Sequence, residues 1–214
     1  MSLPDASRET FLSVLREDLG TIGLVYDEAL LSRCAEMYEL LLSWNQAHNL
    51  TRITDPATAA SRHFTESLFP LTFPCLFPTG LRCADVGSGA GFPGIPLALA
   101  RHDLSWTLIE KAIKKTAFLL FAKASLGLSR VTVCAKDAHA VPSRFDLVIS
   151  RALSIDEKGI ALLSSLLVPG GRLVLYPGRQ QLSFADFSLE ETSTFFRGRL
   201  LRLAVLSPYS SALH

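Results

Sequence analysis

A glycine-rich stretch from Asp85 to Pro96 has the residue types and spacing best suited to chemistry in this 214-residue chain. An apolar run over residues 81–86 precedes it and predicts a buried strand, and the apolar residues 95–100 that follow can open a helix. Glycine tolerates positive φ angles and has no side chain to block a ligand. The order of strand, glycine turn and helix start indicates a nucleotide-type binding site.

The spacing within this stretch separates three kinds of site. A phosphate-binding triphosphatase loop requires Gly-Lys-Ser/Thr, but an isoleucine follows Gly94. A hydrolase nucleophile elbow requires a glycine two positions to each side of the serine, and Ser88 lacks both. A dinucleotide fingerprint fits Gly89, Gly91 and Gly94. Glu110 follows at about the sequence separation at which such sites place the acid that binds ribose hydroxyls. The spacing alone is therefore compatible with this third kind of site.

Asp85, directly ahead of the glycines, favours a cationic ligand. A carboxylate here would repel a pyrophosphate, whereas it attracts the sulfonium and ammonium groups of S-adenosylmethionine. The run Asp-x-Gly-x-Gly-x-Gly from Asp85 to Gly91 therefore resembles the first motif of the class I methyltransferases. The alternative is a glycine turn that only packs a helix against a sheet. We favour the ligand site, because ordering several glycines costs conformational entropy, and a ligand site would explain why they are present.

Further polar residues stand at the predicted ends of later strands, where open parallel sheets bind ligands. Glu110 closes a strand and is expected to accept both ribose hydroxyls. Asp137 and Ala138 follow the next strand and are expected to read the adenine edge. The strand over 145–150 carries Asp146 and is closed by Arg151, a charged pair expected at the same edge of the sheet. From the turn itself, Phe92 could cover the ligand.

The elements that must position these residues follow from apolar spacing. Six strands are predicted, at residues 81–86, 104–109, 131–135, 145–150, 172–176 and 199–206. Helices are predicted between them, at residues 95–102, 111–126 and 157–168. Alternating strands and helices imply right-handed crossovers and a parallel sheet covered on both faces. Pro169-Gly170-Gly171 predicts a turn, and residues 179–194 show no clear pattern.

Helices are also predicted ahead of the glycine stretch, over residues 7–19 and 27–45, and a third opens at Thr54-Asp55-Pro56. The third carries Arg62, His63 and Glu66 at spacings that share a helix face. On spacing alone, the simpler interpretation of this cluster is a solvated face with an ordinary ion pair. We expect residues 1–65 to form a helical extension and residues 66–214 the methyltransferase domain.

Composition and charge narrow the function further. The 49% hydrophobic content suffices for one core, in one domain with a small appendage. Residues 1–40 contain three arginines and eight acidic residues, so the positive excess lies in the rest of the chain, where a polyanion would bind. The basic residues near the predicted site include Arg52, Arg62, Lys111, Lys114, Lys115 and Arg151.

The four cysteines, Cys34, Cys75, Cys83 and Cys134, have no paired spacing and no matching histidines. We therefore expect no metal site and reduced thiols in the cytoplasm. The sequence shows neither a basic signal region nor an apolar run long enough to span a membrane, so no membrane association is expected.

Several motifs taken together resemble the RsmG (GidB) family of bacterial 16S ribosomal RNA guanine-N7 methyltransferases. They are Trp44-Asn45 with residues 49–51, Arg62-His63 with Glu66-Ser67, Asp85 to Pro96, Lys115 with Phe118-Leu119, and Ser150-Arg151-Ala152. The resemblance runs from about residue 41 to residue 178. It implies an α/β fold, the Rossmann-like class I S-adenosylmethionine-dependent methyltransferase with a mostly parallel seven-stranded sheet and an N-terminal helical cap.

The resemblance also implies a reaction and a set of site residues. The cofactor would be S-adenosylmethionine, and the acceptor N7 of one guanine in 16S ribosomal RNA, in naked RNA or in a small ribosomal subunit particle. We expect a monomer. The residues expected at the cofactor are Asp85, Gly87, Ser88, Gly89, Gly91, Phe92, Glu110, Asp137, Ala138 and Arg151. Those expected to be catalytic are Arg151, His63 and Asn45, with Arg62 also facing the RNA.

Three positions depart from the family pattern: Glu66 replaces an aspartate, Ala138 an acidic residue, and Tyr176-Pro177-Gly178 stands where the family usually has Lys-Gly. Two other interpretations stay open. A nicotinamide-dependent oxidoreductase would use the glycines and Glu110 but leaves Asp85 unexplained. A methyltransferase-like RNA-binding assembly factor without catalysis would accommodate Pro177.

Overall fold

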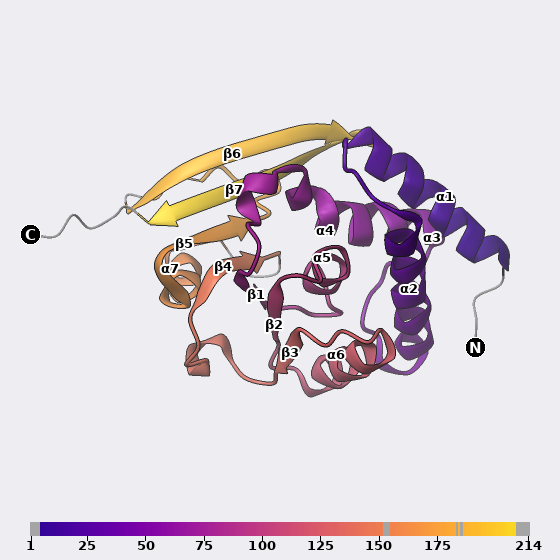
Figure 1. Ribbon diagram of the computed structural model, residues 1–214, viewed down its shortest axis with the longest axis horizontal. Coiled ribbons are helices and arrows are strands. Elements are labelled where there is room, and N and C mark those ends of the chain that lie inside the picture. Colours follow the sequence, from indigo (N-terminus) through magenta and orange to yellow (C-terminus); the bar gives the residue numbers. More distant parts are fainter. Residues whose placement is uncertain (1–4, 152–154, 183, 185, 209–214) are drawn as a thin grey trace, which may run out of the picture.

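The computed structural model describes residues 5–151, 155–182, 184 and 186–208. Its centre is a seven-stranded sheet in the order β3-β2-β1-β4-β5-β7-β6 (Figure 1). The strands are β1 (Arg82–Val86), β2 (Ser105–Ile109), β3 (Val131–Cys134), β4 (Phe145–Ser150), β5 (Leu167–Leu175), β6 (Phe187–Phe196) and β7 (Arg199–Pro208). The first five are parallel, and β7 is antiparallel to both neighbours. The predicted mostly parallel α/β sheet is confirmed.

The longer helices are α1 (Asp5–Thr21), α2 (Glu28–His48), α5 (Gly94–Ala100), α6 (Ile113–Ser125) and α7 (Glu157–Ser165). A continuous helical segment consists of α3 (Pro56–Ala59), the π-helix η1 (Ala60–Thr65) and α4 (Glu66–Leu68). Short 3₁₀ turns are η2 (Phe69–Thr72), η3 (Pro74–Leu76) and η4 (Ala138–Ala140). A π-helix within an α-helical segment frequently marks a functional site.

Side-chain caps explain where two of these helices begin. The Asp27 carboxylate accepts a hydrogen bond of 2.8 Å from the Leu30 amide at the start of α2, and Asp55 accepts one of 2.8 Å from Thr58 at the start of α3. Asn49, with φ 50°, ends α2 in the left-handed conformation. The helix therefore extends to His48, beyond the end predicted at residue 45.

The two faces of the sheet carry separate apolar cores, because alternate strand residues point to opposite sides. The larger core joins the sheet to α1, α2, α5 and α6, and includes Phe11, Tyr38 and Ile95. The smaller one lies under α7 and includes Ile160 and Leu163. The larger core contains residues from both sides of the boundary predicted at residue 65, which itself falls inside the helical segment 56–68.

Two expectations about local structure are wrong. Helix α7 ends at Ser165, and the Pro169-Gly170-Gly171 turn instead lies within β5. It forms a bulge there, since Phe145 pairs with Leu167 whereas Leu147 pairs with Arg172. Residues 179–194, in which the sequence shows no clear pattern, contain most of the edge strand β6, whose side chains are mostly at least partly exposed.

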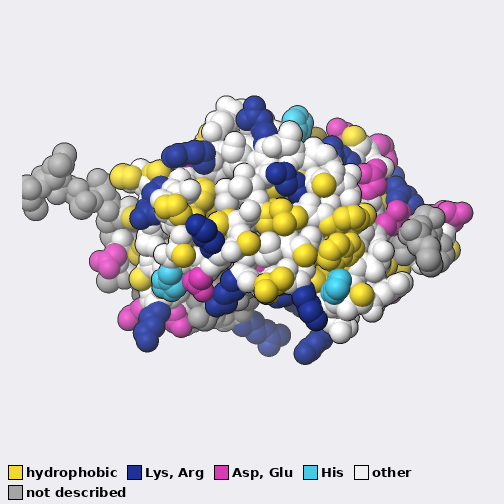
Figure 2. All heavy atoms as spheres, turned by 90° about the horizontal axis from the view of Figure 1, so that it is seen from below, with side chains coloured by type: hydrophobic (Ala, Val, Ile, Leu, Met, Phe, Trp, Pro, Cys, Tyr) yellow, Lys and Arg dark blue, Asp and Glu magenta, His cyan; other side chains and the backbone are white. Residues whose placement is uncertain are grey.

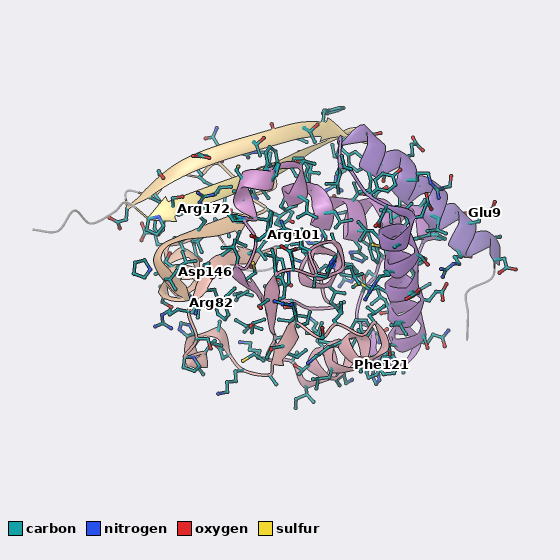
Figure 3. The ribbon with its side chains drawn as sticks, in the orientation of Figure 1. Glu9, Arg82, Arg101, Phe121, Asp146 and Arg172 are labelled. Carbon is teal, nitrogen blue, oxygen red and sulfur yellow. The ribbon has the colours of Figure 1, made fainter. Side chains whose placement is uncertain are left out.

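Asp146 was expected beside Arg151 at the ligand edge of the sheet, and this is also wrong. Asp146 lies near the amino end of β4, where its carboxylate pairs with Arg82 at 3.2 Å (Figure 3). The parallel register places these two residues together at the opposite edge from Arg151.

Within the described ranges, no helix has the length and apolar character needed to cross a membrane.

Candidate active site

The carboxyl ends of β1 and β4 lie side by side at the point where the strand order reverses. The Ser150 hydroxyl at the end of β4 donates to the Val86 carbonyl at the end of β1, at 2.9 Å. The glycine turn follows β1, and Arg151 follows β4. In open α/β sheets this point of reversal is where ligands bind.

The glycine turn has the backbone conformation expected of a ligand cradle. Gly87, Gly89 and Gly91 have φ angles of 76°, 59° and 92°, which other residues rarely adopt. The Gly87 amide donates to the Ile109 carbonyl at 2.9 Å and thereby ties the turn to the end of β2.

The glycines have different neighbours. A Cβ on Gly89 would have only the Gly87 carbonyl within 4 Å, at 3.8 Å, so this side of the turn is open. A Cβ on Gly91 would lie 2.5 Å from the Ile95 side chain. Gly89 therefore leaves room for a ligand, whereas Gly91 is required by the packing of α5.

Asp85 is completely buried beneath the turn. Its Oδ2 accepts a hydrogen bond of 2.9 Å from the Gly94 amide, while Oδ1 has no partner among the described residues. Burial raises the pKa of this carboxyl from its usual 3.8 to about 7. The carboxyl thus supports the turn, and a cationic ligand group would satisfy the unpaired oxygen. This orphaned acceptor and the open cradle at Gly89 fit the predicted cofactor.

Ser88 has a supporting role in the turn. Its buried hydroxyl donates to the Asp85 carbonyl at 2.9 Å, and its own carbonyl accepts from the amides of Gly91 and Phe92 at 2.8 and 3.0 Å. The hydroxyl is thus engaged inside the turn. Any contact of Ser88 with a cofactor would come from its backbone.

Glu110 directly follows β2 and lies beside the glycine turn. One carboxylate oxygen accepts from the Gly89 amide at 2.9 Å and the other from the Ala112 amide at 2.8 Å. Each carboxylate oxygen can accept a second hydrogen bond, so ribose hydroxyls would still find acceptors there.

Asp137 and Ala138 follow β3, the strand next to the one that Glu110 closes. Asp137 accepts from the His139 amide at 3.2 Å and pairs with the Lys111 ammonium at 3.1 Å. The bond from Lys111 is the main reason that the pKa of Asp137 is lowered. Ala138 begins η4, so its backbone is fixed by this cap.

Phe92 contacts two of the predicted catalytic residues, His63 and Arg151. Its ring stacks on the His63 imidazole, with centroids 4.4 Å apart and planes 10° apart. The guanidinium carbon of Arg151 lies 5.8 Å from the centroid of the same ring. Phe92 is only 5% exposed, and so it supports the site from within.

His63 and Asn45 are connected through Thr51. The His63 Nε2 atom is 2.9 Å from the Thr51 hydroxyl, and the Asn45 side-chain oxygen accepts from the Thr51 amide at 2.8 Å. Burial, with further contributions from the charges of Arg151 and Arg62, lowers the pKa of His63 to about 4. The imidazole is therefore neutral at pH 7.

Arg151 bridges the two halves of the site. Its Nη1 donates to the Arg62 carbonyl at 2.9 Å and lies 4.0 Å from the Glu66 carboxylate. Glu66 also pairs with Arg199 at 3.0 Å. Arg62 is exposed, but the interpretation of this cluster as a solvated face with an ion pair inside the helix is wrong, because His63 is buried and Glu66 pairs with Arg151 and Arg199 from elsewhere in the chain.

The sequence pattern did not indicate two further residues of the site: Thr51, which links Asn45 to His63, and Arg199, which the fold brings in from β7. Among the described residues, no group of three histidine, cysteine or acidic side chains could hold a metal ion.

The lower face of the molecule, on the side of α6, carries basic side chains interleaved with apolar ones (Figure 2). Exposed apolar residues of α6 are Ile113, Leu120 and Phe121.

The sheet order, with the glycine turn and acids at the strand ends, defines a class I methyltransferase fold. Solved structures agree. N-methyltransferase NodS from Bradyrhizobium japonicum, in complex with S-adenosyl-L-homocysteine, matches with a TM-score of 0.55 and 16% identity, over 79% of this chain and 98% of NodS. The ribosomal protein L11 methylase of Lactobacillus delbrueckii subsp. bulgaricus gives a TM-score of 0.54 and 20% identity, covering 68% of this chain and 78% of that one.

The family model GidB, described as rRNA small subunit methyltransferase G, matches residues 31–197. The ribosomal RNA small subunit methyltransferase G of Wolinella succinogenes is 35% identical over 189 residues, 88% of this chain and 96% of the relative. That of Aromatoleum aromaticum is 40% identical over 172 residues, 78% of this chain and 80% of the relative. The chain belongs to the GidB family of small-subunit ribosomal RNA methyltransferases, as its motifs predict.

Proposed function

We propose that the protein transfers a methyl group from S-adenosylmethionine to N7 of one guanine in 16S ribosomal RNA, guanine 527 in the family. The observation that carries the proposal is that His63 and Arg151 both contact the Phe92 ring, while Asn45 is linked to His63 through Thr51. Three distant segments of the chain meet there, beside a glycine turn at the point where the strand order reverses. A turn that only packed a helix would not require this arrangement.

The cofactor residues divide into two groups. Gly89 leaves one side of the turn open, and the backbone of Gly87 and Gly89 would face the cofactor there. Glu110 would accept ribose hydroxyls, and Asp137 with Ala138 would border the adenine. Asp85, Ser88 and Gly91 hold the turn in shape, and the unpaired Asp85 oxygen would face the cationic end of the ligand.

The chemistry needs positioning more than proton transfer. When bound, S-adenosylmethionine supplies a methyl group that its sulfonium already activates for displacement. Guanine N7 has a free lone pair, so no side chain has to remove a proton. Holding two reactants in line can lower a barrier by about 7–11 kcal/mol in favourable cases. The neutral, buried His63 agrees with this, because it is placed to position Phe92 and not to act as a base.

Arg151 would act on the RNA. One of its nitrogens is held by the Arg62 carbonyl, and a guanidinium has five N–H donors, so others are left for an RNA acceptor such as a guanine O6. The partner would be 16S ribosomal RNA or the small ribosomal subunit particle, and the cytoplasm is the corresponding location.

The test has two stages. Calorimetric titrations with S-adenosylmethionine and with NADH should show binding of the first alone. Labelled methyl groups should then be incorporated into small-subunit particles from a strain that lacks the modification. Cofactor binding without incorporation into particles or naked RNA would indicate the non-catalytic assembly factor, and binding of NADH alone would indicate the oxidoreductase.

A further inference from the structure

An arginine-lined cavity of about 420 Å³ lies beside the proposed methyl-transfer site, between η1 and the turn that joins β6 to β7. Its charged lining consists of Arg62, Arg151, Arg197, Arg199, Arg202 and Glu66. A cavity of this volume falls in the range that small-molecule ligands occupy. We refer to it as the arginine cavity.

The positive charge in the arginine cavity is only partly neutralised. Arg197 pairs with Glu17 and Asp18, and Arg202 pairs with Glu191. Glu66 is shared by Arg199 at 3.0 Å and Arg151 at 4.0 Å. Over the described part of the chain, the exposed Arg62 side chain has no acidic partner. This excess of guanidinium groups favours an anion, and arginine binds phosphate well because its planar fork matches phosphate oxygens.

An apolar wall faces these charges. Leu200 and Leu201 of β7 contribute to it, together with Phe196 at the end of β6. The Leu200 side chain is 53% exposed, a high value for a leucine. Charge on one side and apolar surface on the other suit a nucleotide, whose phosphate is anionic and whose base has apolar faces.

The arginine cavity adjoins the site where the guanine would bind, because Arg151 lines the cavity and also lies over the Phe92 ring. Its guanidinium faces the Phe92 ring and also donates to the Arg62 carbonyl. We propose that the arginine cavity binds a nucleotide of the RNA strand next to the methylated guanine. Arg62 and Arg199 hold its phosphate, and Leu200 contacts its base. This inference rests on the proposed function.

An ion pair between the half-exposed Arg197 and the buried Asp18 keeps the arginine cavity in shape. Asp18 of α1 is 1% exposed and accepts from Arg197 Nε at 2.5 Å and from the Ser61 hydroxyl of η1 at 2.6 Å. It thereby links α1 to both walls, η1 and the β6–β7 turn. The cavity is thus a built feature of the fold.

The test measures the KM for small-subunit particles and its salt dependence. Arg62→Gln and Arg199→Gln should each raise the KM about tenfold, as expected for the loss of one hydrogen bond to a charged group. The dependence of log affinity on log salt should fall by about 0.7 per arginine, the value for a single strand. Leu200→Glu leaves every arginine in place and should also raise the KM. Affinity for S-adenosylmethionine should not change in any of them.

Matched controls are Arg130→Gln and Val25→Glu. Both residues are exposed and lie outside the lining of the arginine cavity, and Arg130 precedes β3 at the opposite edge of the sheet from Arg151. The proposal is wrong if the three cavity variants have the KM and salt dependence of the controls while methyl transfer persists. Absence of methyl transfer by the unaltered protein would contradict the proposed function instead.

Discussion

The imidazole of His63 stacks on the ring of Phe92, with centroids 4.4 Å apart and planes 10° apart. One ring belongs to the π-helix η1 and the other to the glycine turn, so the stack joins the N-terminal helical region to the proposed cofactor site. Arg151 faces the same Phe92 ring. A displacement of His63 would therefore shift Phe92 at the proposed cofactor site and Arg151 at the proposed RNA site.

His63 is therefore expected to act as a positioning residue. His63→Phe keeps an aromatic ring on Phe92 and should retain most of the turnover, whereas His63→Ala should lose at least tenfold. The turnover of the unaltered protein should show no change near pH 6.5, because the pKa of His63 is lowered to about 4. Turnover against pH for the three proteins checks this. A step near pH 6.5 that His63→Phe abolishes would instead make His63 an acid or base.

The same lowered pKa makes stability depend on pH. The unfolded imidazole takes up a proton below about pH 6.5, whereas the folded one stays neutral down to about pH 4. The contribution of His63 to the free energy of unfolding is fully present above pH 6.5 and is lost as pH falls toward 4. Urea unfolding at pH 7 and pH 4.5 should show a smaller loss in His63→Phe than in the unaltered protein.

Asp85 should have the opposite dependence. Its pKa is raised from 3.8 to about 7, so between these values the folded state binds more protons than the unfolded state. Stability consequently falls as pH rises from about 4 to 7. Asp85→Asn removes this loss and should weaken S-adenosylmethionine binding by more than it lowers stability at pH 7. Urea unfolding curves measure the stability, and calorimetric titration measures the cofactor binding. Equal losses of binding and stability would favour a purely structural role for Asp85.

Gly89 and Gly91 should differ when each is replaced by alanine. Gly91→Ala places a Cβ 2.5 Å from Ile95 at a φ of 92°, so overpacking and backbone strain should cost about 2–4 kcal/mol of stability. Gly89→Ala meets no side chain and should cost only about 1–2 kcal/mol, from its positive φ. It should, however, impair cofactor binding. Thermal unfolding with and without S-adenosylmethionine separates the two effects.

Asp18→Asn should destabilise the fold by about 3 kcal/mol, because it leaves a buried site without the charge that pairs with Arg197. Glu17→Gln is the matched control. Glu17 pairs with the same arginine at 3.3 Å but is 71% exposed, so its loss should cost less than about 1 kcal/mol. Equal effects of the two substitutions on urea unfolding would mean that the buried carboxylate is not a structural link.

The sequence predicts the local parts of the site well. The glycine spacing locates the turn, and Glu110 at the end of an apolar run is found opposite Gly89 because parallel strands end at one edge. The relationships between distant segments could not be predicted. Nothing in the pattern of residues 54–68 indicates a π-helix, or that His63 turns inward onto Phe92 while Glu66 meets Arg199 from β7.

The polar edge strand β6 was missed for a physical reason. Edge strands need only one partner and can expose both faces, so serine, threonine and glutamate obscure the apolar alternation. The sequence predicts a turn at the position of the β5 bulge, because Pro169-Gly170-Gly171 suits a turn and a bulge equally well. Only the pairing with β4 distinguishes the two.

The most direct test of the central claim is to identify the methylated atom. Small-subunit particles from a strain that lacks the modification would be incubated with S-adenosylmethionine and either the unaltered protein or Arg151→Ala, and the 16S RNA nucleosides analysed by mass spectrometry. We predict one N7-methylguanine per particle with the unaltered protein and none with the variant, which should stay folded. Methylation at another atom, or equal methylation by both proteins, would contradict the proposed site.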